Sequence, residues 1–191
     1  MKKNILIIDG HPYDKSFCRA ISHAYQSSAQ DSGHVVQVLT LIDLKFDPIL
    51  RMGYAAIQAL EPDLEKAQQL IKWANHVVVI TPIWWGGPTA LLKGFLDRTM
   101  LPGFAFKYRK NSAWWDQYLT GRTAHVIVTS DAPSWWMRFI RGDSTVNLLV
   151  GATLSFVGIK TKNVLRLGNI KNLNEAGREK LLDQVRKIAK K

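Results

Sequence analysis

The chain of 191 residues contains very few of the side chains that form disulfides and zinc sites. It has one cysteine, Cys18, and five histidines that are scattered along the sequence. One cysteine cannot form an intramolecular disulfide, and dispersed histidines do not provide the ligand spacing of a zinc site. We therefore expect neither a disulfide framework nor a bound metal.

Long apolar runs are also missing. No stretch is long enough to span a bilayer, and the apolar run after Lys3 already ends at Asp9, which is too short for the core of a signal peptide. We therefore expect a cytoplasmic protein without a transmembrane segment. The length and the ordinary apolar fraction of 47% predict one domain over residues 1–191.

Several well-known functional motifs are absent. The chain has no G-x-G-x-x-G fingerprint, no Walker loop and no G-x-S-x-G nucleophile elbow. The formal net charge of +11 favours anionic partners, but the basic residues are spread out and no nucleic-acid motif accompanies them. We interpret the charge as a solvated surface whose field also suits a phosphate-bearing cofactor, and we expect no nucleic-acid partner.

What the sequence does contain is a regular alternation of apolar runs and helical patterns. Strands are predicted at residues 5–8, 35–39, 76–80, 125–129 and 162–167. Helices are predicted after Ser16, from Glu61, after Thr89, near Val146 and after Asn174. This pattern predicts an α/β fold with a five-stranded parallel sheet of order 2-1-3-4-5 and helices on both faces. The three longest loops are expected after the first, third and fourth strands, where such sheets bind ligands.

The most informative segment is TPIWWGGPTALLKGF at residues 81–95. It follows the buried strand and leads into a helix, so two tryptophans and two glycines lie at the carboxyl end of a strand. A glycine pair lets the backbone approach a ligand closely, and adjacent indoles can form a wall for a flat aromatic ring. The alternative is that Trp84 and Trp85 simply pack in the core.

A second candidate segment is the loop from Gly10 to Cys18, which joins the first strand to a helix start. The free backbone N–H groups there, the Ser16 hydroxyl and the His11 imidazole can hold a phosphate. The alternative is that Ser16 only caps the helix. Few titratable residues accompany these loops, which suits chemistry performed by a bound cofactor.

Taken together, five segments resemble the NAD(P)H:quinone oxidoreductase (DT-diaphorase-like) family in order and spacing over nearly the whole chain. They are His11, Ser16-Phe17, PIWWG at 82–86, ALLKGFLDR at 90–98 and GFAF at 103–106. The resemblance implies a flavodoxin-like three-layer sandwich with a noncovalently bound flavin. It also implies two-electron (hydride) transfer from NAD(P)H to a quinone or a similar flat acceptor. The family's longer C-terminal extension is missing, which favours FMN over FAD.

The resemblance further implies which residues hold the flavin. The phosphate would lie at His11 and residues 16–19, and the ring would lie against residues 82–86 and a second loop at 129–132. The implied cofactor-binding residues are His11, Ser16, Phe17, Cys18, Arg19, Pro82, Ile83, Trp84, Trp85, Gly86, Thr129, Ser130, Asp131 and Ala132. The second loop departs from the family's usual Thr-Thr-Gly-Gly.

Family members are homodimers with the site at the interface, so the resemblance implies a homodimer. Phe106 and Tyr108 match aromatic residues that the other subunit contributes to the substrate pocket. Trp135 and Arg141 match the positions of a tyrosine and a histidine near the flavin carbonyl. Arg141 cannot deliver a proton as histidine does, but its charge can stabilise negative charge on the reduced cofactor.

Two other functions stay open at this point. One is a flavodoxin-type electron carrier, although such carriers have a Ser/Thr-rich phosphate loop with Thr-Gly and are usually acidic, unlike this chain. The other is a regulatory subunit, because some relatives attach to potassium-efflux systems.

Overall fold

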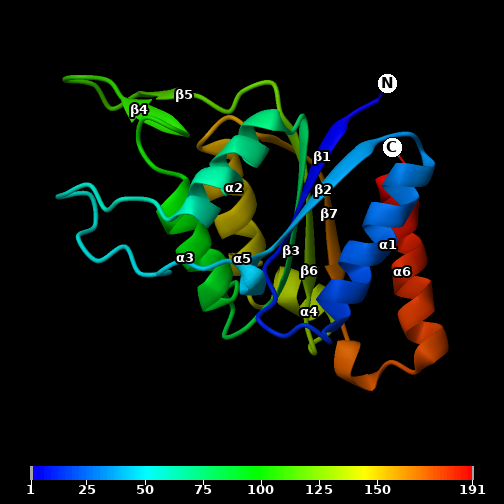
Figure 1. The fold of residues 1–191 in the computed structure, drawn as a ribbon. Helices are drawn as coiled ribbons and strands as arrows, with labels where there is room; N and C mark the ends of the chain where they lie inside the picture. Colours follow the sequence, from blue (N-terminus) through cyan, green and yellow to red (C-terminus); the bar gives the residue numbers. More distant parts are fainter. Residues whose placement is uncertain (1, 191) are drawn as a thin grey trace.

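The computed structural model describes residues 2–190 and places a parallel sheet between two layers of helices (Figure 1). The strands of this sheet run in the order β2-β1-β3-β6-β7. Their bounds are Val35–Thr40 (β2), Asn4–Asp9 (β1), His76–Pro82 (β3), Thr123–Thr129 (β6) and Lys160–Leu167 (β7). The arrangement confirms the predicted order 2-1-3-4-5, with β6 and β7 as the fourth and fifth strands. Residues of the central strand β3 are buried throughout, as a strand covered on both faces requires.

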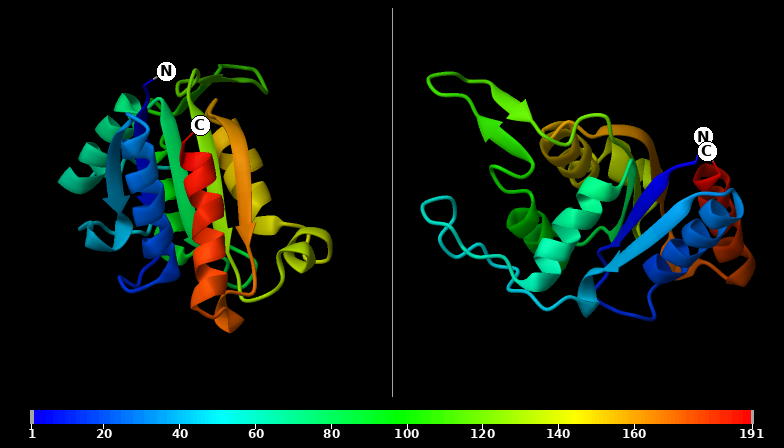
Figure 2. Two further views of the ribbon diagram at one scale, coloured as in Figure 1. Left: turned by 90° about the vertical axis from the view of Figure 1, so that its right-hand side faces the viewer. Right: turned by 45° about the horizontal axis from the view of Figure 1, so that its top comes forward.

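Each face of the sheet carries its own apolar cluster and its own helices (Figures 1 and 2). Helices α1 (Phe17–Asp31) and α6 (Glu175–Ala189) pack side by side on one face. The other face is covered by α2 (Pro62–Trp73), α3 (Ala90–Thr99) and α5 (Ser144–Asn147), which continues as a π-helical segment, Leu148–Ser155. Short 3₁₀ turns lie at Leu41–Asp43 and Ile170–Asn172. Side chains of Ser16, Thr89 and Asn174 cap α1, α3 and α6, as predicted.

The structure also contains elements that the sequence did not predict. They are an antiparallel hairpin of β4 (Phe106–Tyr108) and β5 (Trp115–Gln117), and the short helix α4 (Ser134–Phe139). Strands of three residues are too short to show an apolar alternation, and no residue of α4 is buried, so no apolar face marks that helix. The expected order of loop lengths was also wrong, because the longest connection is residues 44–61, after β2.

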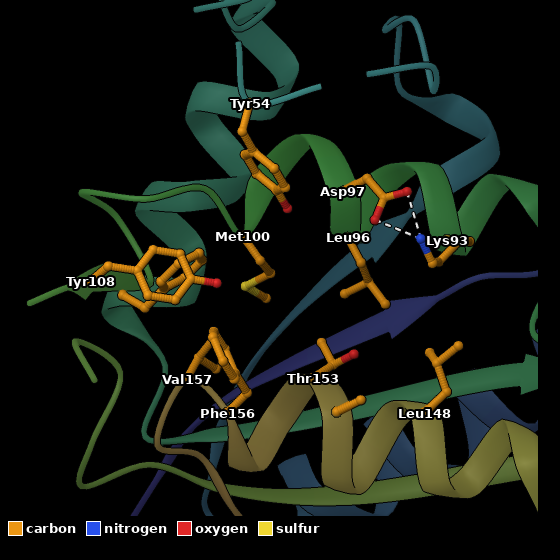
Figure 3. A pocket seen from close by; sticks show the side chains of 12 residues that line it. Tyr54, Lys93, Leu96, Asp97, Met100, Tyr108, Leu148, Thr153, Phe156 and Val157 are labelled. Atoms are coloured by element: carbon orange, nitrogen blue, oxygen red, sulfur yellow. Dashed lines mark hydrogen bonds and ion pairs between the residues drawn. The ribbon is translucent and has the colours of Figure 1, made fainter. Parts of the chain in front are cut away.

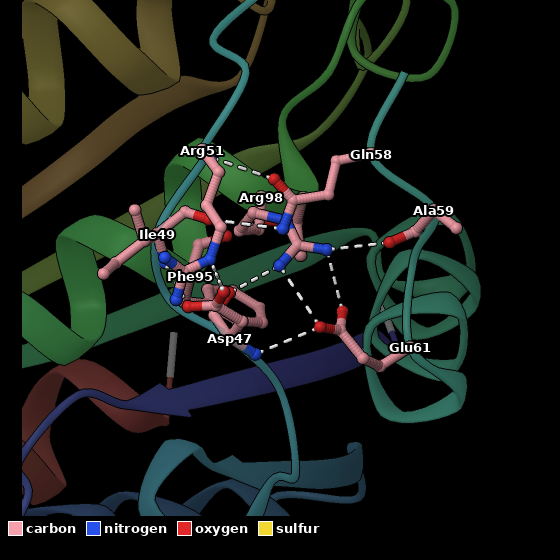
Figure 4. Close-up of polar contacts among 9 residues, drawn as sticks. Asp47, Ile49, Arg51, Gln58, Ala59, Glu61, Phe95 and Arg98 are labelled. Atoms are coloured by element: carbon pink, nitrogen blue, oxygen red, sulfur yellow. Dashed lines mark hydrogen bonds and ion pairs between the residues drawn. The ribbon is translucent and has the colours of Figure 1, made fainter. Parts of the chain in front are cut away.

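This long connection is held against α3 by one buried arginine (Figure 4). The Arg98 side chain is fully buried and donates to the carbonyl oxygens of Asp47 (2.5 Å) and Ala59 (2.8 Å). It also forms a bidentate ion pair with Glu61, at 2.8 and 3.2 Å. Beside it, a Cβ on Gly94 would lie 2.5 Å from Pro48, so only glycine permits this close packing. The guanidinium therefore gives the loop carbonyls the partners that an irregular segment lacks.

We expect Arg98→Met to lower the free energy of unfolding by about 3 kcal/mol, because Glu61 and two carbonyls lose a buried partner. Urea unfolding measures this loss, and limited proteolysis should cut within residues 47–59. Arg51→Ala is the matched control, since it removes an exposed ion pair to Asp47 and should change stability by less than about 0.5 kcal/mol. Equal losses in both variants would contradict the role of Arg98.

The side chains of Tyr25, His76, His125 and Thr123 meet between the sheet and α1, at the amino end of β3. The Tyr25 hydroxyl lies 2.8 Å from His125 Nδ1 and 3.3 Å from His76 Nε2. His76 Nδ1 lies 2.7 Å from the Thr123 hydroxyl, and the two imidazoles pack edge to face. Burial, followed by the charges of His125, Lys3 and His34, lowers the pKa of His76 to about 3.

This shift predicts how stability depends on pH. His76 is neutral in both states above its ordinary pKa of 6.5, so its contribution is fully present there. As pH falls from about 6.5 towards 3, the unfolded chain takes up the proton first, and stability falls by about 1.4 kcal/mol per pH unit. Urea unfolding between pH 7.5 and 4.5 tests this, since His76→Gln should flatten the dependence. The exposed His23 provides the control, and His23→Gln should leave the slope unchanged.

Candidate cofactor site

Three loops that leave the carboxyl ends of β1, β3 and β6 enclose a cavity of about 260 Å³. The strands bring them together because Pro82 pairs with Thr129, and the Gly10 N–H and Ile83 N–H groups bond across to neighbouring strand ends. The cavity is lined by ten of the fourteen residues predicted to bind the cofactor: His11, Ser16, Phe17, Cys18, Pro82, Ile83, Trp84, Thr129, Ser130 and Asp131. Arg19, Trp85, Gly86 and Ala132 do not line it.

One end of the cavity is the N-terminus of α1. The Ser16 hydroxyl accepts the Arg19 N–H at 3.2 Å, and the helical bonds begin with the Ala20 N–H, which donates to the Ser16 carbonyl. The amides of Phe17 and Cys18 precede this first bond and belong to the donors that a helix start leaves for a ligand. Ser16 therefore caps α1, and the same helix start leaves N–H donors for an anion, so the phosphate-binding role of Ser16 stays a prediction.

His11 adds a further donor at this end. Its Nδ1 accepts the Tyr13 N–H at 3.0 Å, so a neutral ring carries its proton on Nε2. Burial lowers the pKa of His11 and outweighs the opposite effect of Asp9, which favours the neutral ring. His11 therefore presents a neutral N–H donor to an anion.

Arg19 lies behind the loop instead of lining the cavity. Its guanidinium lies 3.4 Å from the carboxylate of Asp9 and 3.3 Å from that of Asp14, and it donates to the Thr40 hydroxyl at 2.5 Å. Burial raises the pKa of Asp9, while the His11 amide and Arg19 act in the opposite direction. The contacts of Arg19 with Asp9 and Thr40 tie the ends of β1 and β2 to the start of α1, so Arg19 supports the loop.

The opposite wall of the cavity is formed by Pro82, Ile83 and Trp84, and Trp84 begins a tight turn over residues 84–87. Trp84 and Gly87 exchange two backbone hydrogen bonds of 2.9 Å, and both central residues, Trp85 and Gly86, have positive φ (52° and 78°). Positive φ at both central positions is the signature of a type I′ turn. Trp84 is 48% exposed and meets the His11 ring edge to face, whereas Trp85 is fully exposed. The alternative in which both indoles pack in the core is therefore wrong.

The third wall comes from the loop after β6. The Thr129 hydroxyl lies 3.5 Å from the Cys18 sulfur beneath the cavity, and the Ser130 hydroxyl donates to the Ala132 carbonyl at 2.8 Å. Burial raises the pKa of the Cys18 thiol to about 12, so this residue can serve a ligand through its amide and not through a thiolate. Asp131 accepts the Lys171 N–H at 3.1 Å, which ties the loop to the segment after β7.

The predicted substrate residues lie elsewhere in the chain. Phe106 and Tyr108 line a second cavity of about 330 Å³ beside α3 and the helical segment Leu148–Ser155, with Phe156 and Val157 directly after it (Figure 3). Phe106 packs edge to face on Phe156, with ring centroids 4.9 Å apart, while Tyr108 is exposed. The two cavities share no lining residue, so the fold of this chain does not bring Phe106 and Tyr108 to the cofactor site.

Trp135 and Arg141 do not line the cofactor cavity either. Both side chains are exposed, the first on α4 and the second just after it. Their expected roles stay predictions. Sequence reasoning missed two lining residues, Tyr13 and Ile170. Tyr13 follows His11 in the loop already singled out, whereas Ile170 lies after β7 and no sequence pattern marks it.

The residues present fit a ligand with a phosphate and a flat ring. Helix-start amides, a hydroxyl and a neutral imidazole N–H supply donors for the anion, and a half-exposed indole supplies an aromatic wall. Within residues 2–190, no His, Cys, Asp and Glu side chains are grouped as metal ligands would be. In the same range, no helix combines the length and apolar character needed to cross a membrane.

The family model described as flavodoxin-like fold matches residues 3–190. The chain belongs to this family. As a flavodoxin-like protein, it is similar to the structure of Smu.1420 from Streptococcus mutans, with 31% identity, 98% of each chain covered and a TM-score of 0.83. A protein from Haemophilus influenzae, named an uncharacterized NAD(P)H oxidoreductase, is 26% identical over 94% of this chain and 91% of its own length. The NAD(P)H dehydrogenase (quinone) 1 of Cavia porcellus is 28% identical, covering 83% of this chain and 66% of that enzyme.

Proposed function

We propose that this protein is a flavin-dependent NAD(P)H oxidoreductase that passes a hydride from NAD(P)H through bound flavin to a quinone or a similar flat acceptor. The observation that carries the proposal is the cavity at the carboxyl edge of the sheet, with anion donors at α1 and an indole on the opposite wall. The names of two relatives, an uncharacterized NAD(P)H oxidoreductase and an NAD(P)H dehydrogenase (quinone) 1, support it. An electron carrier is less well supported, because the basic chain lacks the phosphate loop typical of flavodoxins.

The residues of the chain would divide the work as follows. The amides of Phe17 and Cys18, the Ser16 hydroxyl and His11 Nε2–H would bind the phosphate. Residues 82–86 would orient the ring, and the Trp84 indole would exclude water from it. When bound, the flavin supplies hydride acceptance and donation, for which protein side chains have no equivalent.

We further propose FMN as the resident flavin. Arg19 is already engaged by Asp9 and Asp14, and it does not line the cavity. The donors at α1 would therefore serve a single phosphate. FMN carries one phosphate and FAD carries a pyrophosphate, so this arrangement favours FMN.

Purified protein should contain FMN, or take it up, with absorption bands of a bound flavin and a released cofactor of the mass of FMN. Trp84→Ala should weaken FMN binding about tenfold or more, because the indole wall is lost. Trp114→Ala, which removes an exposed indole from the hairpin, is the control and should bind as the parent does. A protein that binds neither FMN nor FAD would contradict the proposed function.

We also propose that the protein is a homodimer whose substrate pocket uses residues of both subunits. The segment 44–61 and the hairpin β4–β5 project from the same side of the molecule (Figure 2). Between them lies the cavity of about 330 Å³, with Tyr54 and Tyr108 exposed on its lining. Aromatic side chains are enriched at interfaces, and a second copy would cover these two.

Sedimentation velocity at micromolar concentration tests the homodimer, which predicts twice the mass of the 21.6 kDa chain. Tyr54→Asp combined with Tyr108→Asp should shift the protein to the monomer, because two carboxylates would be buried at the interface. Ile42→Asp, at an exposed position next to β2, should remain a dimer. A fully active monomeric parent would rule the homodimer out.

Arg141 is proposed to stabilise negative charge on the reduced cofactor and not to donate a proton, since its guanidinium stays charged at working pH. Arg141→Ala should slow cofactor reduction by NAD(P)H in stopped-flow measurements and leave flavin binding intact. Arg141→His should recover part of the rate and introduce an ionisation near neutral pH. Reduction of the alanine variant at the parent's rate would place Arg141 outside the site.

A further inference from the structure

One backbone carbonyl in the tryptophan turn receives two side-chain hydrogen bonds from a distant part of the chain. The Gly86 oxygen accepts the Ser144 hydroxyl at 2.5 Å and the Thr145 hydroxyl at 2.9 Å. Both donors lie in the first turn of α5, 58 and 59 residues further along the chain. A turn that already has its own pair of backbone bonds is thus held a second time from outside.

The turn needs outside support because its conformation is unfavourable for its sequence. Trp85 has φ of 52°, a region in which a bulky side chain crowds its own backbone. Its indole is fully exposed, so packing within the protomer does not compensate for this strain. Gly86 suits its own φ of 78°, and a Cβ there would lie only 3.3 Å from the Ser144 hydroxyl oxygen. The hydroxyls therefore act where strain and close approach coincide.

Burial fixes one of the two donors, Thr145, whereas Ser144 is exposed. Thr145 is 1% exposed, so its side chain has little freedom to turn away from Gly86. Asp143, which precedes α5, has φ of 54° and is paired by both carboxylate oxygens with the Arg166 guanidinium from β7. The ion pair between Arg166 and Asp143 therefore connects the start of α5, which carries the two hydroxyls, to strand β7 of the sheet.

We propose that Ser144 and Thr145 are positioning residues that hold the turn of residues 84–87 in its ligand-binding conformation. The two backbone bonds of the turn use the amides of Trp84 and Gly87, and of the turn residues 84–87 it is Trp84 that lines the cofactor cavity. The Gly86 carbonyl shares its peptide plane with the Gly87 N–H, which donates to the Trp84 carbonyl and closes the turn. By fixing this peptide, the two hydroxyls set the position of Trp84 on the cavity wall and thus the affinity for the flavin ring. This inference rests on the proposed function for its ligand, but not for the conformation of the turn.

The first test needs no cofactor. In the protein freed of ligand, Ser144→Ala combined with Thr145→Val should speed hydrogen exchange of the Trp84 and Gly87 amides about tenfold, because the Gly86–Gly87 peptide loses the two hydroxyl bonds that hold it from outside the turn. Thr161→Val is the matched control, since it removes a buried hydroxyl that has no hydrogen-bond partner in residues 2–190. Unchanged exchange in the double variant would overturn the proposal whether or not the protein binds flavin.

The second test measures the dissociation constant of FMN by fluorescence. The double variant should bind FMN about tenfold more weakly than the parent and than Thr161→Val. The same comparison is then made in a protein that carries Trp85→Asn, because an Asn-Gly pair favours a type I′ turn without hydrogen bonds from outside the turn. In that background, loss of the two hydroxyls should weaken FMN binding no more than about twofold.

The outcomes separate the possible failures. A tenfold loss in both backgrounds would mean that the hydroxyls act on the ligand directly, and it would overturn the positioning role. An unchanged dissociation constant in the double variant would overturn it as well. A parent that binds neither FMN nor FAD contradicts the proposed function alone, and the exchange measurement then decides the role of Ser144 and Thr145.

Discussion

The parallel register of β1, β3 and β6 is the constraint on which the site depends. Asp9 pairs with Ile80, and Pro82 pairs with Thr129, so the three strands end at nearly the same level. Two backbone bonds then join the loops at their first residues, from Gly10 N–H to Ile80 and from Ile83 N–H to Thr129. A slip of one residue in β3 would turn its buried side chains to the opposite face and separate these loops. The cavity is thus a product of strand pairing before any loop side chain contributes.

Local signals explain why much of this could be predicted from the sequence. Apolar runs mark the sheet strands, and hydroxyl or amide caps at Ser16, Thr89 and Asn174 mark helix starts through bonds to residues three positions away. The tryptophan turn was also placed correctly, at the carboxyl end of β3. The hairpin, α4 and the length of the segment 44–61 were not predicted, because short or exposed elements have no apolar periodicity. The positions of Trp135 and Arg141 came from a resemblance alone, and no contact in one protomer could be foreseen for them.

The contacts that sequence reasoning missed have a common form. Arg98 reaches carbonyl oxygens 51 and 39 residues away, and Ser144 and Thr145 reach one that is 58 and 59 residues away. In each case, a side chain near one end of a helix donates to the backbone of an irregular segment, which has no ladder of its own to satisfy its carbonyls. Such bonds depend on the completed fold and have no signature in spacing. These hydrogen bonds fix the conformation of the segment 44–61 and of the turn 84–87, as backbone bonds between strands fix the sheet.

The burial of Cys18 bears on the proposed reduction of quinones. Quinones are electrophiles that form covalent adducts with thiolates, and the attacking species is the thiolate and not the thiol. The one cysteine of this chain lies under the cofactor cavity with its pKa raised to about 12, so almost none of it is ionised at neutral pH. The Cys18 thiol therefore offers the proposed substrates almost no thiolate, and repeated turnover would not arylate this part of the site.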